Sequence, residues 1–248
     1  MTLNFPMYLK AVRSILDHIE STQIQAIDRA AELAASALTH QGIVYCYEIG
    51  HANQHDFLNR AGGLAGVQGF TFSLSMTDPT PECLKSRPGG REVDRDLETA
   101  RLAVRASNMR EGDILVLGSV SGKNKVPIEV ALACREIGVK VFAITSITYT
   151  YQVESLHPSG KKLFEVADVA IDNGAPYGDA ACQLAGMEGN VLPVSGVSAI
   201  VIGWMIWEAT IEKMVSAGTP PTVFQSFNRE GGPEFYKRMK DQYEQRGY

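Results

Sequence analysis

Five short apolar runs, each of strand length, alternate with segments of helical periodicity along most of this chain. The runs are GIVYCYEI, VQGFTFSL, DILVLGS, VKVFAITS and VADVAID, which begin at residues 42, 67, 113, 139 and 166. Helical patterns are predicted at 53–61, 92–109 and 125–137, and near 196–216. Strands that alternate with helices in this way pair in parallel, with helices on both faces of the sheet. The sequence therefore predicts an α/β fold.

The rest of the chain fits a single domain spanning 1–248. Two amphipathic helices are predicted within 3–40, where apolar residues recur at spacings near three and four. The Pro-rich stretch Thr77–Gly90 is predicted to be a loop that is too short for an interdomain linker. The uncharged run Gly189–Trp207 is predicted to be a buried loop and helix, and 230–248 a polar tail.

Composition excludes several classes of partner and location. The 23 Lys and Arg residues against 28 Asp and Glu give a net charge of −5, so no global positive field attracts nucleic acid or an anionic membrane. Lys10, Arg13 and Asp17 interrupt the apolar residues near the N-terminus, which argues against a signal peptide. The four cysteines form no C-x-x-C pair, as expected for reduced thiols. A cytoplasmic location is predicted.

One loop carries the strongest chemical signal. The run Asp113–Leu117 leads directly into GSVSGKNKVPIE, where helical periodicity begins. Two hydroxyls, two glycines and a lysine therefore meet at a helix N-terminus, which favours an anion such as phosphate. A structural turn with a helix cap is the alternative for this spacing. The loop matches no Walker A motif, and the absence of G-x-G-x-x-G argues against NAD or FAD, so no cofactor is predicted.

The segment GSVSGKNKVPIEVALACREIGVKVFAITS resembles the S-x-S-G loop, helix and following strand of the sugar isomerase (SIS) domain family. ESLHPSGKKLFEVADVAIDNGAPYGDA, RAGGL and PPTVFQSFNREGG resemble its single-domain, phosphoheptose-isomerase-like subgroup. The resemblance implies a flavodoxin-like three-layer α/β/α sandwich of about five parallel strands. It also implies a loop that grips the phosphate of a phosphosugar, and a homodimer or homotetramer with sites close to subunit interfaces.

The resemblance assigns ligand contacts to residues of this loop. Ser119, Ser121 and Asn124 correspond to side chains that hold the phosphate, and the backbone of Val120 and Gly122 assists. Asn124 stands where many relatives have Thr or Ser. The full set of binding candidates is Ser119, Val120, Ser121, Gly122, Lys123, Asn124, Ser146 and Asp179. Turn chemistry is the alternative for the last two.

The loop after the first strand departs from the family pattern. Relatives typically read G-[ST]-G-H-S there, whereas this chain has Glu48-Ile-Gly-His51-Ala, so one phosphate hydroxyl is missing. Glu48 and His51 become candidates for an acid and a base, because both belong to a strand end that faces the predicted crevice. His51 and His55 are also spaced to share a helix face and a divalent metal, but no metal is assigned because half of the family's zinc site is absent.

His157 is the first candidate for the catalytic base, followed by Glu48 and His51. It lies in a loop after the fourth predicted strand, although capping a short helix that starts at Ser159 would explain it equally well. The predicted function is aldose–ketose isomerisation of a phosphosugar or related sugar derivative, by proton transfer through an enediol. The alternatives are a non-catalytic sugar-phosphate-binding module and a relative of amino-sugar phosphate etherases or deaminases.

Overall fold

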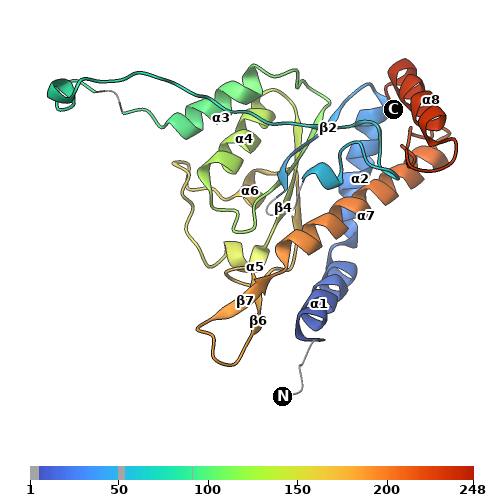
Figure 1. Cartoon of the computed structure of the whole chain (residues 1–248), viewed down its shortest axis with the longest axis horizontal. Helices are drawn as coiled ribbons and strands as arrows, with labels where there is room; N and C mark the ends of the chain where they lie inside the picture. Colours follow the sequence, from blue (N-terminus) through green and yellow to red (C-terminus); the bar gives the residue numbers. More distant parts are fainter. Residues whose placement is uncertain (1–5, 50–53, 91) are drawn as a thin grey trace.

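A parallel sheet of five strands forms the centre of the molecule, in the order β2-β1-β3-β4-β5. The computed structural model describes residues 6–49, 54–90 and 92–248 (Figure 1). The strands are β1 (Val44–Ile49), β2 (Val67–Gly69), β3 (Ile114–Gly118), β4 (Lys140–Thr145) and β5 (Val169–Asp172). Every neighbouring pair in this sheet runs parallel, and Leu115 lies opposite both Tyr45 and Val141. The predicted five-stranded parallel sheet is confirmed.

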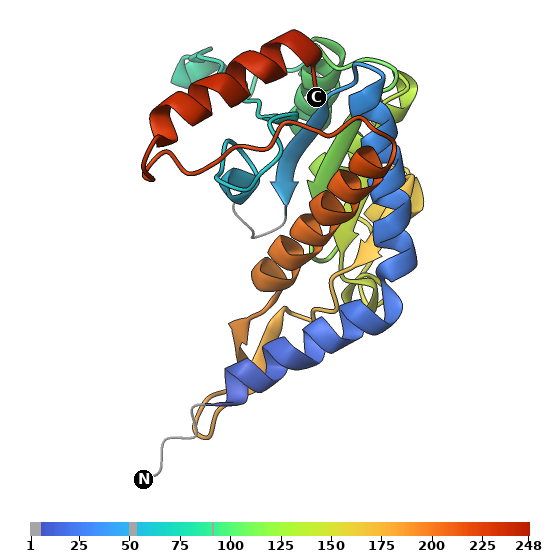
Figure 2. The same cartoon turned by 90° about the vertical axis from the view of Figure 1, so that its right-hand side faces the viewer.

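Helices cover both faces of the sheet and make the fold a three-layer α/β/α sandwich, as predicted. They are α1 (Pro6–Thr22), α2 (Ile24–Thr39), α3 (Arg95–Arg105), α4 (Lys125–Glu136), α5 (Ile147–Thr150), α6 (Leu163–Val166), α7 (Ser195–Ser216) and α8 (Gly232–Arg246). Because side chains alternate along a strand, Val116 enters the core beneath α2 and α7, whereas Leu117 enters the core beneath α3 and α4. In Figure 2, α7 crosses one face of the sheet beside α2.

The strand order locates the crevice in which this fold class binds ligands. The chain passes from β1 outward to β2 and then returns to the other side of β1 as β3. Ligands bind at such a reversal, outside the carboxyl ends of the strands. The loop after β1 falls largely in 50–53, outside the described residues. The loop after β3, at 119–124, is described in full.

Three predicted elements differ from the structure. The run from Val67 pairs only as far as Gly69, because β2 is an edge strand and its register with β1 ends at Cys46. The helix predicted over 53–61 is, from residue 54 on, the 3-10 turn η1 (Gln54–Asp56), since Asn59 has a φ of 51° that an α-helix excludes. The run Gly189–Trp207 begins with an exposed strand of an unpredicted antiparallel hairpin, formed by β6 (Ala180–Gln183) and β7 (Asn190–Pro193).

A long connection between β2 and α3 leaves the body of the molecule. We call residues 73–93 the arm, of which 91 lies outside the described residues; the predicted loop Thr77–Gly90 forms most of it. Figure 1 shows the arm extending away from the sheet, with the short turn η2 (Glu82–Leu84) at its tip. Its described residues are all exposed. The backbone bonds recorded within the arm are local ones at the tip, such as Leu84 N–H to the carbonyl of Pro81.

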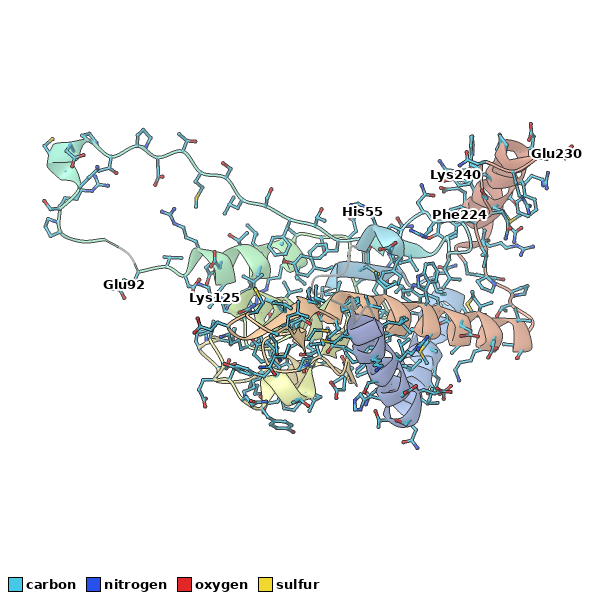
Figure 3. All side chains as sticks on the ribbon, turned by 60° about the horizontal axis from the view of Figure 1, so that its bottom comes forward. His55, Glu92, Lys125, Phe224, Glu230 and Lys240 are labelled. Atoms are coloured by element: carbon cyan, nitrogen blue, oxygen red, sulfur yellow. The ribbon has the colours of Figure 1, made fainter. Side chains whose placement is uncertain are left out.

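The predicted polar tail contains the helix α8, which lies next to the edge strand β2. Tyr236 donates its hydroxyl to Asn59, with 2.6 Å between the oxygens, and Tyr243 and Lys240 line a hollow of about 350 Å³ shared with Val67. Figure 3 places Lys240 and Phe224 together in this region. An edge covered by a helix is less open to pairing with another chain. No helix of the described segments is long and apolar enough to cross a membrane.

Candidate functional site

The loop between β3 and α4, residues 119–124, is bound to the protein through its carbonyl groups. We call it the serine loop. Five consecutive carbonyls accept hydrogen bonds from the segment 145–163. The donors are Thr145 Oγ1 to Ser119 (2.7 Å), the Ser146 amide to Val120 (2.9 Å), Thr150 Oγ1 to Ser121 (2.9 Å), the Leu163 amide to Gly122 (2.9 Å) and the Leu156 amide to Lys123 (2.9 Å).

This bonding pattern leaves donors on the opposite side of the serine loop. A trans peptide holds its C=O and N–H in opposite directions, so the next amide points away from the segment that binds the carbonyl. Within the described part of the chain, no acceptor contacts the amides of Val120, Ser121, Lys123 and Asn124. The hydroxyls of Ser119 and Ser121 also have no partner there, although both residues are largely buried. Such outward amides beside a helix N-terminus form an anion-binding nest.

Gly122 makes this turn of the serine loop possible. Its φ of 62° is left-handed, a conformation that costs other residues free energy. A Cβ atom at this position would lie 2.8 Å from Thr150 Oγ1 and 3.0 Å from Thr145 Oγ1. The two threonine hydroxyls that bind the loop carbonyls therefore fill the space that a side chain would need.

The last two residues of the serine loop carry polar side chains that face solvent. Asn124 is the N-cap residue of α4 in an extended conformation, but its side chain makes no capping bond. Lys123 is half-buried, and within the described residues its ammonium group has no ion-pair partner. Both side chains are available to a ligand at the start of α4, as the resemblance implies.

Two further candidates have side chains that are already used inside the protein. Ser146 is fully buried; its hydroxyl donates to the Ala175 carbonyl and accepts from the Tyr149 amide at 3.1 Å. Asp179 caps α7 instead of facing open solvent: Oδ1 accepts from the Ser195 amide at 2.9 Å and Oδ2 from the Ser195 hydroxyl at 2.6 Å. Each group would have to give up a bond to contact a sugar, so their ligand roles stay predictions.

His157 belongs to a buried hydrogen-bonded cluster at the side of α4. Its Nδ1 accepts from the Ser159 amide at 3.1 Å, so Nε2 carries the proton and donates to Glu129 Oε2 at 2.8 Å. The other Glu129 oxygen accepts from Arg101 Nε at 2.7 Å, and this hydrogen bond is the main cause that raises the pKa of Arg101. Only 6% of the His157 side chain and 5% of the Glu129 side chain are exposed.

The geometry bears directly on the predicted role of His157. Both ring nitrogens have partners inside the chain, and Nδ1 caps a turn at Ser159, where the sequence alternative had placed the start of a short helix; the next helix, α6, begins at Leu163. To act as a base, His157 would have to release one of these bonds. Its catalytic role stays a prediction.

The other catalytic candidates are Glu48 and His51. Glu48 is part of β1, at the carboxyl edge of the sheet, and His51 lies outside the described residues. His55 is in η1. Within the ranges that the structure describes, no three His, Cys, Asp or Glu side chains are close enough together to hold a metal ion.

Two hollows of similar size lie at opposite edges of the sheet. One of about 500 Å³ is lined by His40, Arg110 and Lys140 at the amino edge, far from the serine loop. The other, of about 490 Å³, lies between the base of the arm and the starts of α3 and α4, where Arg95 and Val126 line it. The second hollow is the more relevant to function, because it adjoins the first turn of α4. The first hollow is lined by no residue of the serine loop.

Sequence reasoning missed the residues that hold the serine loop in place. Thr145 was recognisable as the end of a strand, but nothing in the sequence marks Thr150 as a donor to Ser121. Glu129 is buried, although a glutamate on a helix is usually solvated. An available signal was its place in the apolar stretch Ile128–Cys134, where the only charged residue is Glu129.

Comparison with known proteins identifies the family. The profile described as "SIS domain" matches residues 7–146. A UPF0309 protein of Halalkalibacterium halodurans is 35% identical over 98% of this chain and 99% of its own length. A UPF0309 protein of Listeria innocua is 31% identical over 96% of this chain and 95% of its own length. A phosphoheptose isomerase from Francisella tularensis has a similar fold, with a TM-score of 0.52 at 14% identity over 86% of this chain and 99% of that one. The chain belongs to the SIS domain family and, within it, to the UPF0309 proteins.

Proposed function

We propose that the serine loop binds the phosphate group of a sugar phosphate. The observation that carries the proposal is the set of outward donors: four backbone amides and two serine hydroxyls that have no partner among the described residues, beside the N-terminus of α4. The ammonium group of Lys123 adds a mobile positive charge at the same place. Membership of the SIS family and the fold shared with a phosphoheptose isomerase support a phosphosugar over other phosphate esters.

Thermal unfolding with and without ligand tests this binding. Sugar phosphates should raise the melting temperature, since a ligand that binds only the native state stabilises it by mass action, and the matching free sugars should raise it less. Replacing both Ser119 and Ser121 with Ala should remove the response and leave the protein folded. Ser216→Ala, at the exposed end of α7, is the control and should respond like the wild type. A full response in the double variant would reject the serine loop as the phosphate site.

The proposed reaction is aldose–ketose isomerisation through an enediol. It needs a group that removes the C2 proton, and the candidates are His157, Glu48 and His51, of which His51 lies outside the described residues. The test is exchange of the C2 hydrogen of a bound sugar phosphate with deuterated solvent. Replacing the true base should lower turnover by roughly 10² to 10⁴-fold and keep binding. Exchange that survives His157→Gln, Glu48→Gln and His51→Gln would reject all three candidates.

A non-catalytic sugar-phosphate-binding module is the second candidate function. The observation in its favour is that the ring nitrogens of His157 are both occupied inside the chain. The same exchange experiment separates the two functions. Sugar phosphates that bind tightly and never exchange their C2 hydrogen would favour the binding module.

We also propose that the protein assembles as a homodimer or as a dimer of dimers. The first turns of α7 leave apolar side chains open to solvent: Val197 is exposed, and Val201 is half-buried. The arm likewise exposes apolar side chains that a second copy would cover. Such contacts are reciprocal in a two-fold dimer.

Cys83 offers a direct readout of this assembly. It is exposed at the tip of the arm, whereas Cys46, Cys134 and Cys182 are buried. If a second copy covers the arm, alkylation of Cys83 should slow as protein concentration rises, in step with dimer formation measured by light scattering. A monomer at all micromolar concentrations would contradict the proposed assembly.

A further inference from the structure

The outer half of the serine loop depends on a turn that lies outside the loop itself. The amides of Leu156 and Leu163, which bind the carbonyls of Lys123 and Gly122, flank residues 157–162. The Leu156 amide fixes the direction of the peptide between Lys123 and Asn124, and therefore also the direction of the Asn124 amide. The interactions that hold this turn in place therefore also fix the direction of the Asn124 amide, one of the proposed phosphate donors.

His157 holds this turn from within. Its Nδ1 accepts the Ser159 amide, and its own amide donates to Ser155 Oγ at 3.1 Å. The Ser155 hydroxyl in turn donates to the Lys161 carbonyl at 2.6 Å, which closes the turn. These bonds shape the turn but do not connect it to the helix that follows the serine loop.

The connection to that helix runs through Glu129. Its carboxylate, on the second turn of α4, accepts the Nε2 proton of His157 at 2.8 Å and the Nε proton of Arg101 on α3 at 2.7 Å. The three side chains therefore tie the turn, α4 and α3 together where α4 leaves the serine loop. A buried polar cluster of this kind fixes the relative positions of the segments it joins but adds little net stability, because its bonds must offset the cost of removing charged groups from water.

We propose that Glu129 and His157 are positioning residues, which act through the turn to hold the Asn124 amide in its phosphate-binding direction. The inference rests on the proposed phosphate site. In this role neither side chain has to contact the phosphate group. Without the Nε2–Glu129 bond, the turn moves relative to α4, the Lys123 carbonyl loses its donor and the Lys123–Asn124 peptide rotates freely.

Two replacements of His157 separate its two bonds. In His157→Gln the side-chain amide nitrogen stands near the position of Nε2 and can donate to Glu129, but the cap at Ser159 is lost. In His157→Asn the side-chain oxygen stands near Nδ1 and can accept the Ser159 amide, but the bond to Glu129 is lost. If positioning depends on the link to α4, Gln should preserve phosphate binding better than Asn does.

The matched control is an ion pair that joins the same two helices away from the loop. Arg105 Nη2 on α3 lies 2.7 Å from Glu136 Oε2 on α4, and both side chains are about half exposed. Glu136→Gln should leave phosphate binding unchanged. Glu129→Gln should weaken binding, because the amide has only one oxygen, so its NH₂ group would face the N–H of either His157 or Arg101, a donor against a donor.

The measurements are titration with inorganic phosphate and hydrogen exchange of single amides without ligand. His157→Asn should weaken phosphate binding about tenfold, which corresponds to about 1.4 kcal/mol. It should also speed exchange of the Leu156 amide, with a smaller change in His157→Gln.

Wild-type protein that binds neither phosphate nor sugar phosphates would overturn the proposed function. An unchanged Leu156 amide in a folded His157→Asn variant would overturn the positioning role, whatever the phosphate titration gives. Equal weakening in Gln and Asn would also overturn it, since the cap alone would then matter.

Discussion

Two connections leave the same edge of the sheet and are built in opposite ways. The serine loop joins β3 to α4 within 119–124, and five of its carbonyls are bonded to the segment 145–163. The arm joins β2 to α3, and its described residues are exposed along their whole length. Figure 3 shows the side chains of the arm standing out from the backbone, with Glu92 far from the sheet.

The contrast indicates what each connection can do by itself. Five carbonyls of the serine loop are bonded, and four of its six amides have no partner within the described residues. The loop would therefore lose little ordering entropy on binding the proposed phosphate. Within the described residues of the arm, the recorded backbone hydrogen bonds are local ones at the tip, and Leu74, Met76 and Leu84 are exposed to water. A second molecule would have to supply the contacts that the arm lacks.

The largest expected effect comes from a side chain added where the serine loop is tightest. Gly122→Ala places a Cβ 2.8 Å from Thr150 Oγ1 at a φ of 62°, so we expect a loss of about 3 kcal/mol in unfolding free energy and loss of phosphate binding. Gly160→Ala is the control, with a φ of 71° and no atom within 4 Å of its Cβ. It should cost about 1 kcal/mol, for the left-handed backbone alone. Urea unfolding measures both losses, and similar losses of unfolding free energy in the two variants would contradict the tight fit at Gly122.

A smaller loss is expected when one donor to the serine loop is removed. Thr150→Val keeps the shape of the side chain but leaves the Ser121 carbonyl unsatisfied, at a cost of about 2 kcal/mol. It should also weaken phosphate binding, because the neighbouring peptide is released. Thr210→Val is the control: Thr210 is equally buried, but its hydroxyl donates to the Ile206 carbonyl inside α7, where the helix supplies that carbonyl with a donor as well. Thr210→Val should therefore cost less than 1 kcal/mol. Calorimetry and phosphate titration check both, and a larger loss for Thr210→Val would contradict the argument.

The sequence predicted the position of the serine loop but not what holds it. A buried apolar strand followed by Ser119-Val-Ser-Gly122 and a helical pattern fixes a loop at the carboxyl edge of a parallel sheet, because these are local features. The partners of its carbonyls come from residues 145–163, which the fold alone brings next to it. Ser146 and Asp179 were expected near a ligand because they follow strands, yet their buried oxygens serve a turn and a helix end.

Glu129 and the arm resisted prediction for different reasons. A glutamate on a helix is usually solvated, so its burial depends on a histidine and an arginine that are distant in sequence. The part of the arm at Thr77–Gly90 was correctly predicted to be a loop, whereas residues 73–74 were predicted to be in a strand and 92–93 in a helix. A Pro-rich composition indicates that a segment forms neither a helix nor a strand, but not the direction in which it runs.

The return of the arm to the body offers a pH test. Asp94 caps α3 and accepts both Asp96 and Leu97 amides, and the hydrogen bond from Lys125 is the main cause that lowers its pKa. A carboxyl whose folded pKa is depressed stabilises the fold above its unfolded pKa, and this contribution disappears as the pH falls through the folded pKa. Lys125→Met should raise the pKa of Asp94 toward its ordinary value, measured by carboxyl NMR titration. An Asp94 titration identical in both proteins would show that Lys125 does not anchor the base of the arm.

The smallest effect on unfolding is expected in the arm itself. Leu84 is 44% exposed at the tip of the arm, so Leu84→Ser removes few contacts and should change the unfolding free energy of the isolated chain by less than about 0.5 kcal/mol. The same substitution should weaken dimer formation if a second copy covers the tip, because apolar area buried between copies contributes about 25 cal/mol per Å². Leu102→Ser is the control, since Leu102 is 59% exposed on α3, outside the arm. Sedimentation over a concentration series should show weaker self-association for Leu84→Ser than for Leu102→Ser. Equal self-association would mean that the arm extends into solvent in the dimer as well, and that the contrast with the serine loop persists in the assembly.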